Sequence, residues 1–490
     1  AIRRASDHGH IETVKVLLQD ERVDPSDCVN DPIRRASSNG HTEIVKLLLQ
    51  DERVDPSADD NYAIQWASKN GHTEIVKLLL QDERVDPSAE RNFAIRFASV
   101  NGHTEIVKML LQAERVDPSA DDNLVITMAC PSGYIEIVKM LLQDERVDPS
   151  ADGNYAIQSA SFSGHTEIVK LLLQDQRVDP SADDNDAIRW ASSNGHIETV
   201  MVLLQDERVD PSAKNNESIR FASKNGHIEI INLFLKDERV DPSAHDNDAI
   251  RLASGNGHTD IVRVLLQDQR VDPSAHDNDA IRKASKNGHT ETVRVLLQDE
   301  RVDFSTKNNE SIRFASKNGH IEIVKLFLED ERVDPSVDEN CAIRWASENG
   351  HIEIVKLFLK DERVDPSADQ NYAIRWASSN GHTETVKLLL QDERVDPSAH
   401  DNDAIRWASS NGHTETVRLL LQYERVDPSA KNNESIRFAY KNGHIEIVKL
   451  FLKDERVDPS VDQNYAIRKA SENGHIEIVR MLLKDERVDP

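Results

Sequence analysis

The chain has 490 residues, and its 60 Lys and Arg residues against 88 Asp and Glu residues give a net charge of −28 at pH 7. Such an acidic chain should repel nucleic acid and anionic membrane surfaces, whereas a protein partner with a basic surface would be attracted to it. The alternative interpretation is that the charge only keeps a long array in solution.

The three cysteines (Cys28, Cys130 and Cys341) show no pairing pattern, and no apolar run approaches the ~20 residues that a membrane-spanning helix needs. These features favour an intracellular protein, and we expect it in the cytoplasm, as a monomer without a cofactor.

One stretch, seen clearly at residues 61–91, is repeated along the whole chain. Its Gly71-His72 pair returns every 31 residues, from Gly9 to Gly474, without an insertion or deletion. A fixed period of about 20–50 residues is typical of a repeat array. The sequence therefore predicts a single array over residues 1–490, with fifteen units of 31 residues and a truncated last unit at 466–490. Because both ends lie within a repeat and lack a polar capping unit, we expect a fragment of a longer array.

The first helix of the unit is predicted over residues 63–67, with Asn61 as its N-cap. It should end near Asn70, because Gly71 can adopt the left-handed conformation that follows many helices. Sixteen of the eighteen glycines occupy this one position of the repeat, so the same stop is expected in every unit.

A second helix is predicted over residues 73–80. Its Ile, Val and Leu side chains are too widely distributed for one apolar stripe, so neighbouring elements must cover it on several sides. Pro87 then prevents further helix and turns the chain back. Since 31 residues are too few to fold alone, each helix pair must be buried by its neighbours. The predicted fold is all-α, an α-solenoid of about sixteen stacked helix–turn–helix units.

The segment from Asn70 to Leu80 resembles the turn and second helix of ankyrin repeats, and Tyr62–Ala67 stands where that family has Thr-Pro-Leu-His-x-Ala. The resemblance covers the whole chain. The period here is shorter than the ~33 residues of the family. The missing residues precede the first helix, where ankyrin repeats form a β-hairpin finger. We therefore expect a tighter turn, with partner contacts shifted onto the first helix.

The repeated histidines do not indicate a metal site, because ligands must converge within about 2 Å of one ion while neighbouring repeats lie ~10 Å apart. The Asp82–Asp86 run lacks the pattern of a calcium loop, and Arg84 is expected to pair with its acidic neighbours. No phosphate-binding loop, nucleophile motif or zinc motif is present. The sequence predicts neither an enzyme nor a metal site.

Positions that vary between the copies indicate where a partner would be recognised. Tyr62, Trp66 and Lys69 share one face of the first helix. We call these three positions of the repeat the first, middle and third slots, and the residues that occupy them differ from unit to unit. All five tryptophans occupy the middle slot. The third slot, held elsewhere by Glu348 and Ser379, corresponds to a variable, exposed place in ankyrin repeats. The candidate protein-binding residues are Tyr62, Trp66, Lys69, Phe97, Trp190, Phe314, Trp345, Glu348, Trp376, Ser379, Trp407 and Phe438.

Two interpretations of the middle slot are open at this stage. Its aromatic residues could form a binding strip on the concave face, because Trp and Tyr are enriched at interface hot spots. They could equally pack between helices as framework, because aromatic side chains gain most when they are buried.

The leading functional hypothesis is a protein-interaction scaffold that binds a protein along the concave first-helix face. The alternatives are a structural spacer or elastic element without a specific ligand, and a substrate-recruiting arm of a ubiquitin-ligase-type assembly. A contiguous apolar patch on the face of Tyr62, Trp66 and Lys69 would distinguish the scaffold from the spacer.

Overall fold

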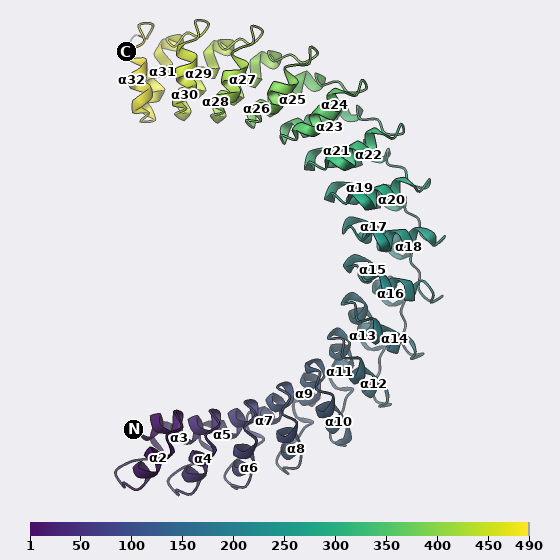
Figure 1. Ribbon diagram of the computed structural model, residues 1–490, viewed down its shortest axis with the longest axis vertical. Coiled ribbons are helices and arrows are strands. Elements are labelled where there is room, and N and C mark those ends of the chain that lie inside the picture. The colour runs from purple at the N-terminus through teal and green to yellow at the C-terminus, as the bar shows by residue number, and fades with distance from the viewer. Residues whose placement is uncertain (489–490) are drawn as a thin grey trace. The chain divides into compact units, whose positions relative to one another are not determined.

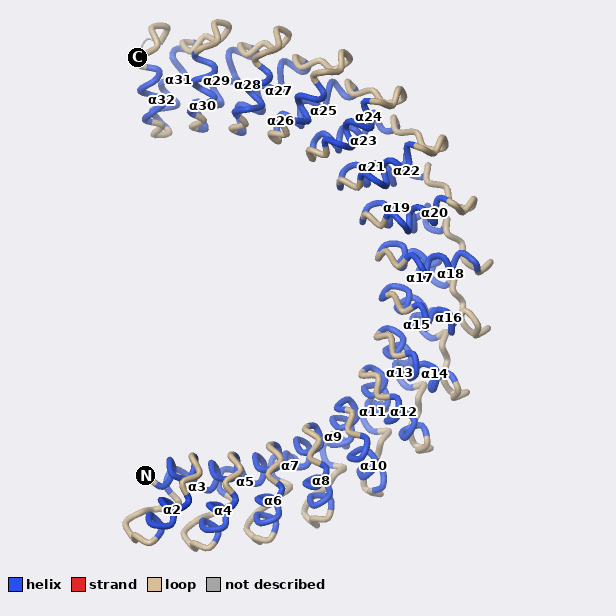
Figure 2. Tube along the Cα trace, viewed as in Figure 1, coloured by secondary structure: helices blue, strands red, loops and turns tan. Residues whose placement is uncertain are grey.

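A computed structural model describes residues 1–488, and every regular element in this range is a helix (Figures 1 and 2). The helices follow one another as pairs, one pair per repeat, which confirms the predicted all-α solenoid. The chain divides into two compact units, Ala1–Ala244 (unit 1) and His245–Pro490 (unit 2).

Unit 1 contains a first and a second helix for each of its repeats. The first helices are α1 (Ile2–Asp7), α3 (Asp27–Ser38), α5 (Ala58–Lys69), α7 (Ala89–Val100), α9 (Ala120–Ala129), α11 (Ala151–Phe162), α13 (Ala182–Ser193) and α15 (Ala213–Asn225), with a 3₁₀ turn, η1 (Cys130–Ser132), after α9. The second helices are α2 (Ile11–Leu18), α4 (Thr42–Leu49), α6 (Thr73–Leu80), α8 (Thr104–Leu111), α10 (Ile135–Gln143), α12 (Thr166–Leu173), α14 (Ile197–Leu204) and α16 (Ile228–Phe234).

Unit 2 repeats this arrangement. Its first helices are α17 (Ala244–Gly255), α19 (Ala275–Asn287), α21 (Thr306–Asn318), α23 (Val337–Glu348), α25 (Ala368–Ser379), α27 (Ala399–Asn411), α29 (Ala430–Asn442) and α31 (Val461–Glu472). Its second helices are α18 (Thr259–Gln267), α20 (Thr290–Leu297), α22 (Ile321–Leu328), α24 (Ile352–Leu359), α26 (Thr383–Leu389), α28 (Thr414–Leu420), α30 (Ile445–Leu452) and α32 (Ile476–Leu482).

Within each unit the odd-numbered helices form one row and the even-numbered helices another (Figure 1). Neighbours in the odd row pack together more extensively than neighbours in the even row, so each unit bends toward its odd-numbered helices. The core lies between the rows. In the repeat at 61–91, Ile64 and Ala67 of α5 are fully buried together with Val76 and Leu79 of α6.

A left-handed turn lies near the start of each first helix from α3 to α29, and in α5 it corrects the expected role of Asn61. Residues Asp59, Asp60 and Asn61 all have φ between 53° and 65°, so Asn61 is not a helix N-cap. Its Oδ1 instead accepts a hydrogen bond of 2.7 Å from the backbone N–H of Asp86. Asp and Asn tolerate this conformation better than other non-glycine residues. This compact turn replaces a finger, as the short stretch before the helix predicts.

A glycine and a histidine join consecutive repeats. Gly71 has φ of 82° and ends α5 as predicted. The neighbouring His72 reaches the preceding repeat, where its Nε2 donates to the carbonyl of Ser38 at 3.0 Å. Its ring lies against Gly40 so closely that a Cβ there would be 2.7 Å from the His72 Cε1 atom. A glycine is therefore required at this position of the repeat for two reasons. It adopts the left-handed backbone conformation, and it leaves space for the histidine ring of the next repeat.

The turn after each second helix is closed by an arginine. Arg84 donates to both carboxylate oxygens of Asp82, at 2.9 and 2.6 Å, which confirms the expected pairing within the acidic run. Another guanidinium nitrogen donates to the Val54 carbonyl of the preceding repeat at 2.8 Å. The hydrogen bonds from Arg84 lower the pKa of Asp82 below its usual value. In this repeat and in most others, the pair therefore ties one turn to the turn before it.

The fifth repeat departs from this pattern at two places. Pro131 lies in η1, which replaces the last turn of the first helix. Tyr134 stands where other repeats have the histidine, and its side chain remains 41% exposed beside Gly102.

We predict that Tyr134→His stabilises this repeat by about 1 kcal/mol, because a histidine could donate to the carbonyl of Val100 as the others do. Amide hydrogen exchange in α8 and α10 should slow. Tyr155→His is the matched control, since Tyr155 is equally exposed (42%) but lies outside the turn. An equal effect of both changes, or none from Tyr134→His, would contradict this role of the histidine.

Ala113 occupies the Asp82 position in the fourth repeat, so Arg115 lacks the carboxylate that Arg84 has. A carboxylate whose pKa is lowered by folding adds stability above the usual Asp pKa and loses that effect as the pH falls through the lowered pKa. Ala113→Asp should therefore raise the thermal unfolding midpoint at about pH 7 and lose this gain as the pH falls below the usual Asp pKa and through the lowered one. Ala113→Asn, which has no titrating group, should show no such loss; a pH-independent gain from Asp would refute the ion pair as its cause.

Candidate protein-binding surface

The middle slot of the first helices carries nine aromatic residues, which we call the aromatic strip. All nine are partly exposed, so none is enclosed in the core. This excludes complete burial as framework and leaves each ring with surface that a partner could cover. The strip consists of Trp66, Phe97, Trp190, Phe221, Phe314, Trp345, Trp376, Trp407 and Phe438.

In unit 1, rings from two successive repeats form a continuous cluster. The ring centroids of Tyr62 and Trp66 are 5.4 Å apart, those of Trp66 and Phe93 are 6.3 Å apart, and those of Phe93 and Phe97 are 4.1 Å apart. The ammonium of Lys69 lies 4.2 Å from the Trp66 ring centroid and 5.3 Å from that of Phe97. Aromatic rings and a cation thus share one face of α5 and α7.

Unit 2 has the longest succession of strip residues. Phe314 and Trp345 stack with centroids 5.9 Å apart. Trp376 contacts Tyr372 of its own helix at 5.5 Å and Trp407 of the next repeat at 5.3 Å. Ring contacts therefore cross the junctions between repeats, from α21 to α23 and from α25 to α27.

Some contributors to this surface were not among the sequence candidates. Phe162, 53% exposed, meets Trp190 edge-on at 5.9 Å. Phe93 and Tyr372 complete two of the clusters described above. All three lie in the first or third slot of the same helix face, so alignment of the repeats with one another could have identified them. Phe438, a sequence candidate, is partly exposed.

The third slot proves less uniform than expected. Lys69 lies over the rings, and the Glu348 carboxylate accepts a hydrogen bond of 3.0 Å from the Tyr372 hydroxyl. Ser379, by contrast, is only 9% exposed. Asn411 of the next repeat lies against it and donates to its Oγ at 3.1 Å. Ser379 thus belongs to the junction between α25 and α27, contrary to the expectation of an accessible contact residue.

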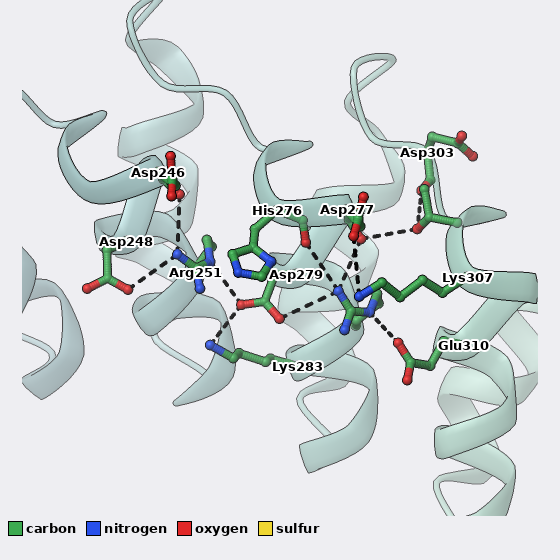
Figure 3. A network of polar contacts seen from close by, with 12 residues as sticks. Asp246, Asp248, Arg251, His276, Asp277, Asp279, Lys283, Asp303, Lys307 and Glu310 are labelled. Carbon is green, nitrogen blue, oxygen red and sulfur yellow. Dashed lines mark hydrogen bonds and ion pairs between the residues drawn. The ribbon is translucent and has the colours of Figure 1, made fainter.

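Arginines one residue before the middle slot connect neighbouring first helices, which the sequence analysis missed. Arg251 donates to Asp279 of the next repeat at 2.9 Å, and Lys283 pairs with the same carboxylate at 2.8 Å (Figure 3). Arg282 makes the equivalent contact to Glu310 at 2.5 Å. Burial alone would raise the pKa of Asp279, but hydrogen bonds from Lys283 and Arg251 lower it below its usual value. These carboxylates are therefore already occupied within the array.

The first slot decides what each arginine contacts. Where the next repeat has an acid in this slot, the arginine pairs with it. Where it has a tyrosine, the guanidinium lies over the ring and also pairs with an aspartate three residues earlier, as Arg34 does with Asp59 and Arg344 with Asp369. Arg34 is 4.6 Å from the Tyr62 ring centroid, and Arg344 is 4.9 Å from that of Tyr372. Tyr62 thus contributes both to the aromatic cluster and to the junction between its repeat and the preceding one.

Neither a metal site nor a membrane span is found in the part of the chain that the structure describes. No three His, Cys, Asp or Glu side chains among these residues gather closely enough to hold an ion. None of the described helices combines the length and the apolar character needed to cross a bilayer.

Comparison with known proteins identifies one family along nearly the whole chain. No curated protein matches the sequence. A family model described as "Ankyrin repeats (3 copies)" matches in a succession of segments, most of which overlap, at residues 2–91, 33–124, 83–152, 126–215, 219–308, 284–369, 344–432 and 405–490.

The most buried junction gives a test of the arginine contacts. Asp403, whose side chain is 3% exposed, pairs with Arg375 at 3.2 Å and with Arg406 at 2.6 Å. Asp403→Ala would leave the buried guanidinium of Arg375 without its carboxylate, while Arg406 would keep its pair with Glu434, so we expect a loss of about 3 kcal/mol in urea unfolding. Asp403→Tyr should cost less, because a tyrosine can lie under the arginine as Tyr372 does. If Asp403→Tyr lowers the free energy of unfolding as much as Asp403→Ala does, a tyrosine ring cannot replace the carboxylate as a contact for the arginine.

Proposed function

The chain belongs to the ankyrin repeat family, and we propose that it is a non-enzymatic scaffold that binds a protein partner along its odd-numbered helices. Ankyrin repeats are generally protein–protein interaction modules. In this proposal the aromatic strip supplies the main contacts, and the turns and even-numbered helices hold the strip in place.

The observation that carries the proposal is the partial exposure of successive strip residues that contact one another across repeats. Trp376 and Trp407 illustrate it, since each ring is already oriented by its neighbour yet retains accessible surface. Covering the remaining apolar surface of such rings would contribute about 25 cal/mol per Å². Because the rings are held before binding, little side-chain entropy would be lost.

A spacer without a ligand accounts less well for this surface. Contiguous exposed apolar groups favour unwanted association, so a purely structural array gains nothing by keeping them. A substrate-recruiting arm of a larger assembly would use the same strip, and would differ only in what the array is attached to.

We predict that the double variant Trp376→Lys/Trp407→Lys loses the partner without losing the fold. Lysine already occupies this slot at Lys283, so the array accommodates its side chain. The measurement is the recovery of cross-linked proteins, from the organism that makes the chain, by the double variant and by the parent protein. Circular dichroism of both proteins then checks that each is folded.

The matched control is Met201→Lys, on the outer face of α14, where Met201 is 47% exposed and most other repeats have lysine. It adds positive charge on the opposite row and should leave recovery unchanged. A partner retained by the double variant but lost by Met201→Lys would place binding on the even-numbered helices. Recovery of the same proteins by all three chains would support the spacer.

A further inference from the structure

Two lysines in unit 2 differ from the other cations around them. Lys286 and Lys317 occupy the third slot of α19 and α21, and both are exposed. The Lys286 ammonium lies 5.4 Å from the Phe314 ring centroid, and that of Lys317 lies 5.1 Å from the Trp345 ring centroid. Among the described residues, neither lysine forms an ion pair with a carboxylate.

Neighbouring cations are already paired. On the same row, Lys283 pairs with Asp279, Arg282 with Glu310, and Arg313 with Asp338 at 2.6 Å. On the even row, Lys325 pairs with Glu322 at 2.7 Å and Lys356 with Glu353 at 2.6 Å. Lys286 and Lys317 are therefore the positive charges still available for a partner at this part of the strip.

We propose that Lys286, Phe314, Lys317 and Trp345, which we call the lysine–aromatic site, bind an extended acidic segment of the partner protein. The inference rests on the proposed function and specifies the chemistry of its partner. The lysines would pair with carboxylates, and the partly exposed Phe314 and Trp345 rings would contact apolar side chains between them. The site ends at Glu348, whose carboxylate is held by Tyr372.

The proposed partner segment is acidic, whereas the net charge of the chain suggests a basic partner. The charge of −28 attracts a basic partner at long range, but it is distributed over the whole chain. At the site itself the carboxylates of Glu310 in α21 and Asp338 in α23 are engaged by arginines, and the charges left without an ion-pair partner among the described residues are those of the two lysines. At physiological ionic strength a contact responds mainly to charges within about 8 Å, so the local sign governs the docked segment.

The spacing also selects the kind of segment. Equivalent residues of adjacent repeats lie about 10 Å apart, close to the ~9 Å that three residues span in a polyproline II conformation. Acidic residues at every third position would therefore meet Lys286 and Lys317 in turn. A nucleic acid also combines negative charge with stacking bases, but its dense phosphates would be repelled by the acidic chain as a whole.

The test uses the full chain and a fluorescently labelled peptide of repeated Glu-Leu-Pro triplets, with binding followed by anisotropy. Lys286→Ser/Lys317→Ser should weaken binding by about fivefold or more, and added salt should weaken binding to the parent. Serine is native to this slot at Ser193 and Ser410. The matched control, Lys325→Met/Lys356→Met, removes the same charge from the even row and should bind as the parent does. Unchanged circular dichroism verifies that both variants are folded.

Three results would overturn the inference: equal binding by the serine variant, equal or tighter binding of the matching Lys-Leu-Pro peptide, or tighter binding of oligothymidylate. The scaffold proposal is tested separately, by the variant Trp376→Lys/Trp407→Lys. If the acidic peptide does not bind but Trp376→Lys/Trp407→Lys still loses its cross-linked protein, the partner is recognised by other chemistry. If neither binding is seen, both proposals fail.

Discussion

The contact between the glycine of one repeat and the histidine of the next is the constraint on which the array depends. Gly40 provides the left-handed turn that ends α3 and leaves the space into which the ring of His72 fits. The same ring donates to the Ser38 carbonyl, which lies at the C-terminal end of α3 and has no acceptor role within that helix. One residue pair therefore ends a helix, satisfies its backbone and sets the position of the following repeat.

Because this contact fixes the spacing, the face of the first helices is free to vary. The arginines adapt to that variation, since a guanidinium can pair with a carboxylate or lie over an aromatic ring. Arg282 does the first with Glu310, and Arg344 does both, because it lies over Tyr372 while it pairs with Asp369. The first slot can thus change between acidic and aromatic residues without loss of the junction. The aromatic strip and its lysines lie beside these junctions, on surface that stacking of the repeats covers only in part.

The repeat, the helix pairs and the roles of Gly71 and Pro87 could be predicted from the sequence because they depend on local backbone preferences and period. The left-handed turn at Asn61 could not be predicted in this way. Three consecutive left-handed residues are unfavourable in isolation, and they are held here by the contact between Asn61 and Asp86. The composition of the candidate surface followed from comparing repeats with one another. The burial of Ser379 could not be predicted in this way, because it depends on Asn411 in the first helix of the next repeat.

All five tryptophans of the chain lie in the aromatic strip, so tryptophan fluorescence reports on this surface alone. The most direct test of the account is acrylamide quenching of that fluorescence in the protein alone and in complex with its purified cross-linked partner. Partly exposed rings should be quenched in the free protein and protected in the complex, with emission shifted to shorter wavelength. Equal quenching with a stoichiometrically bound partner would contradict the account, because the partner would then lie elsewhere.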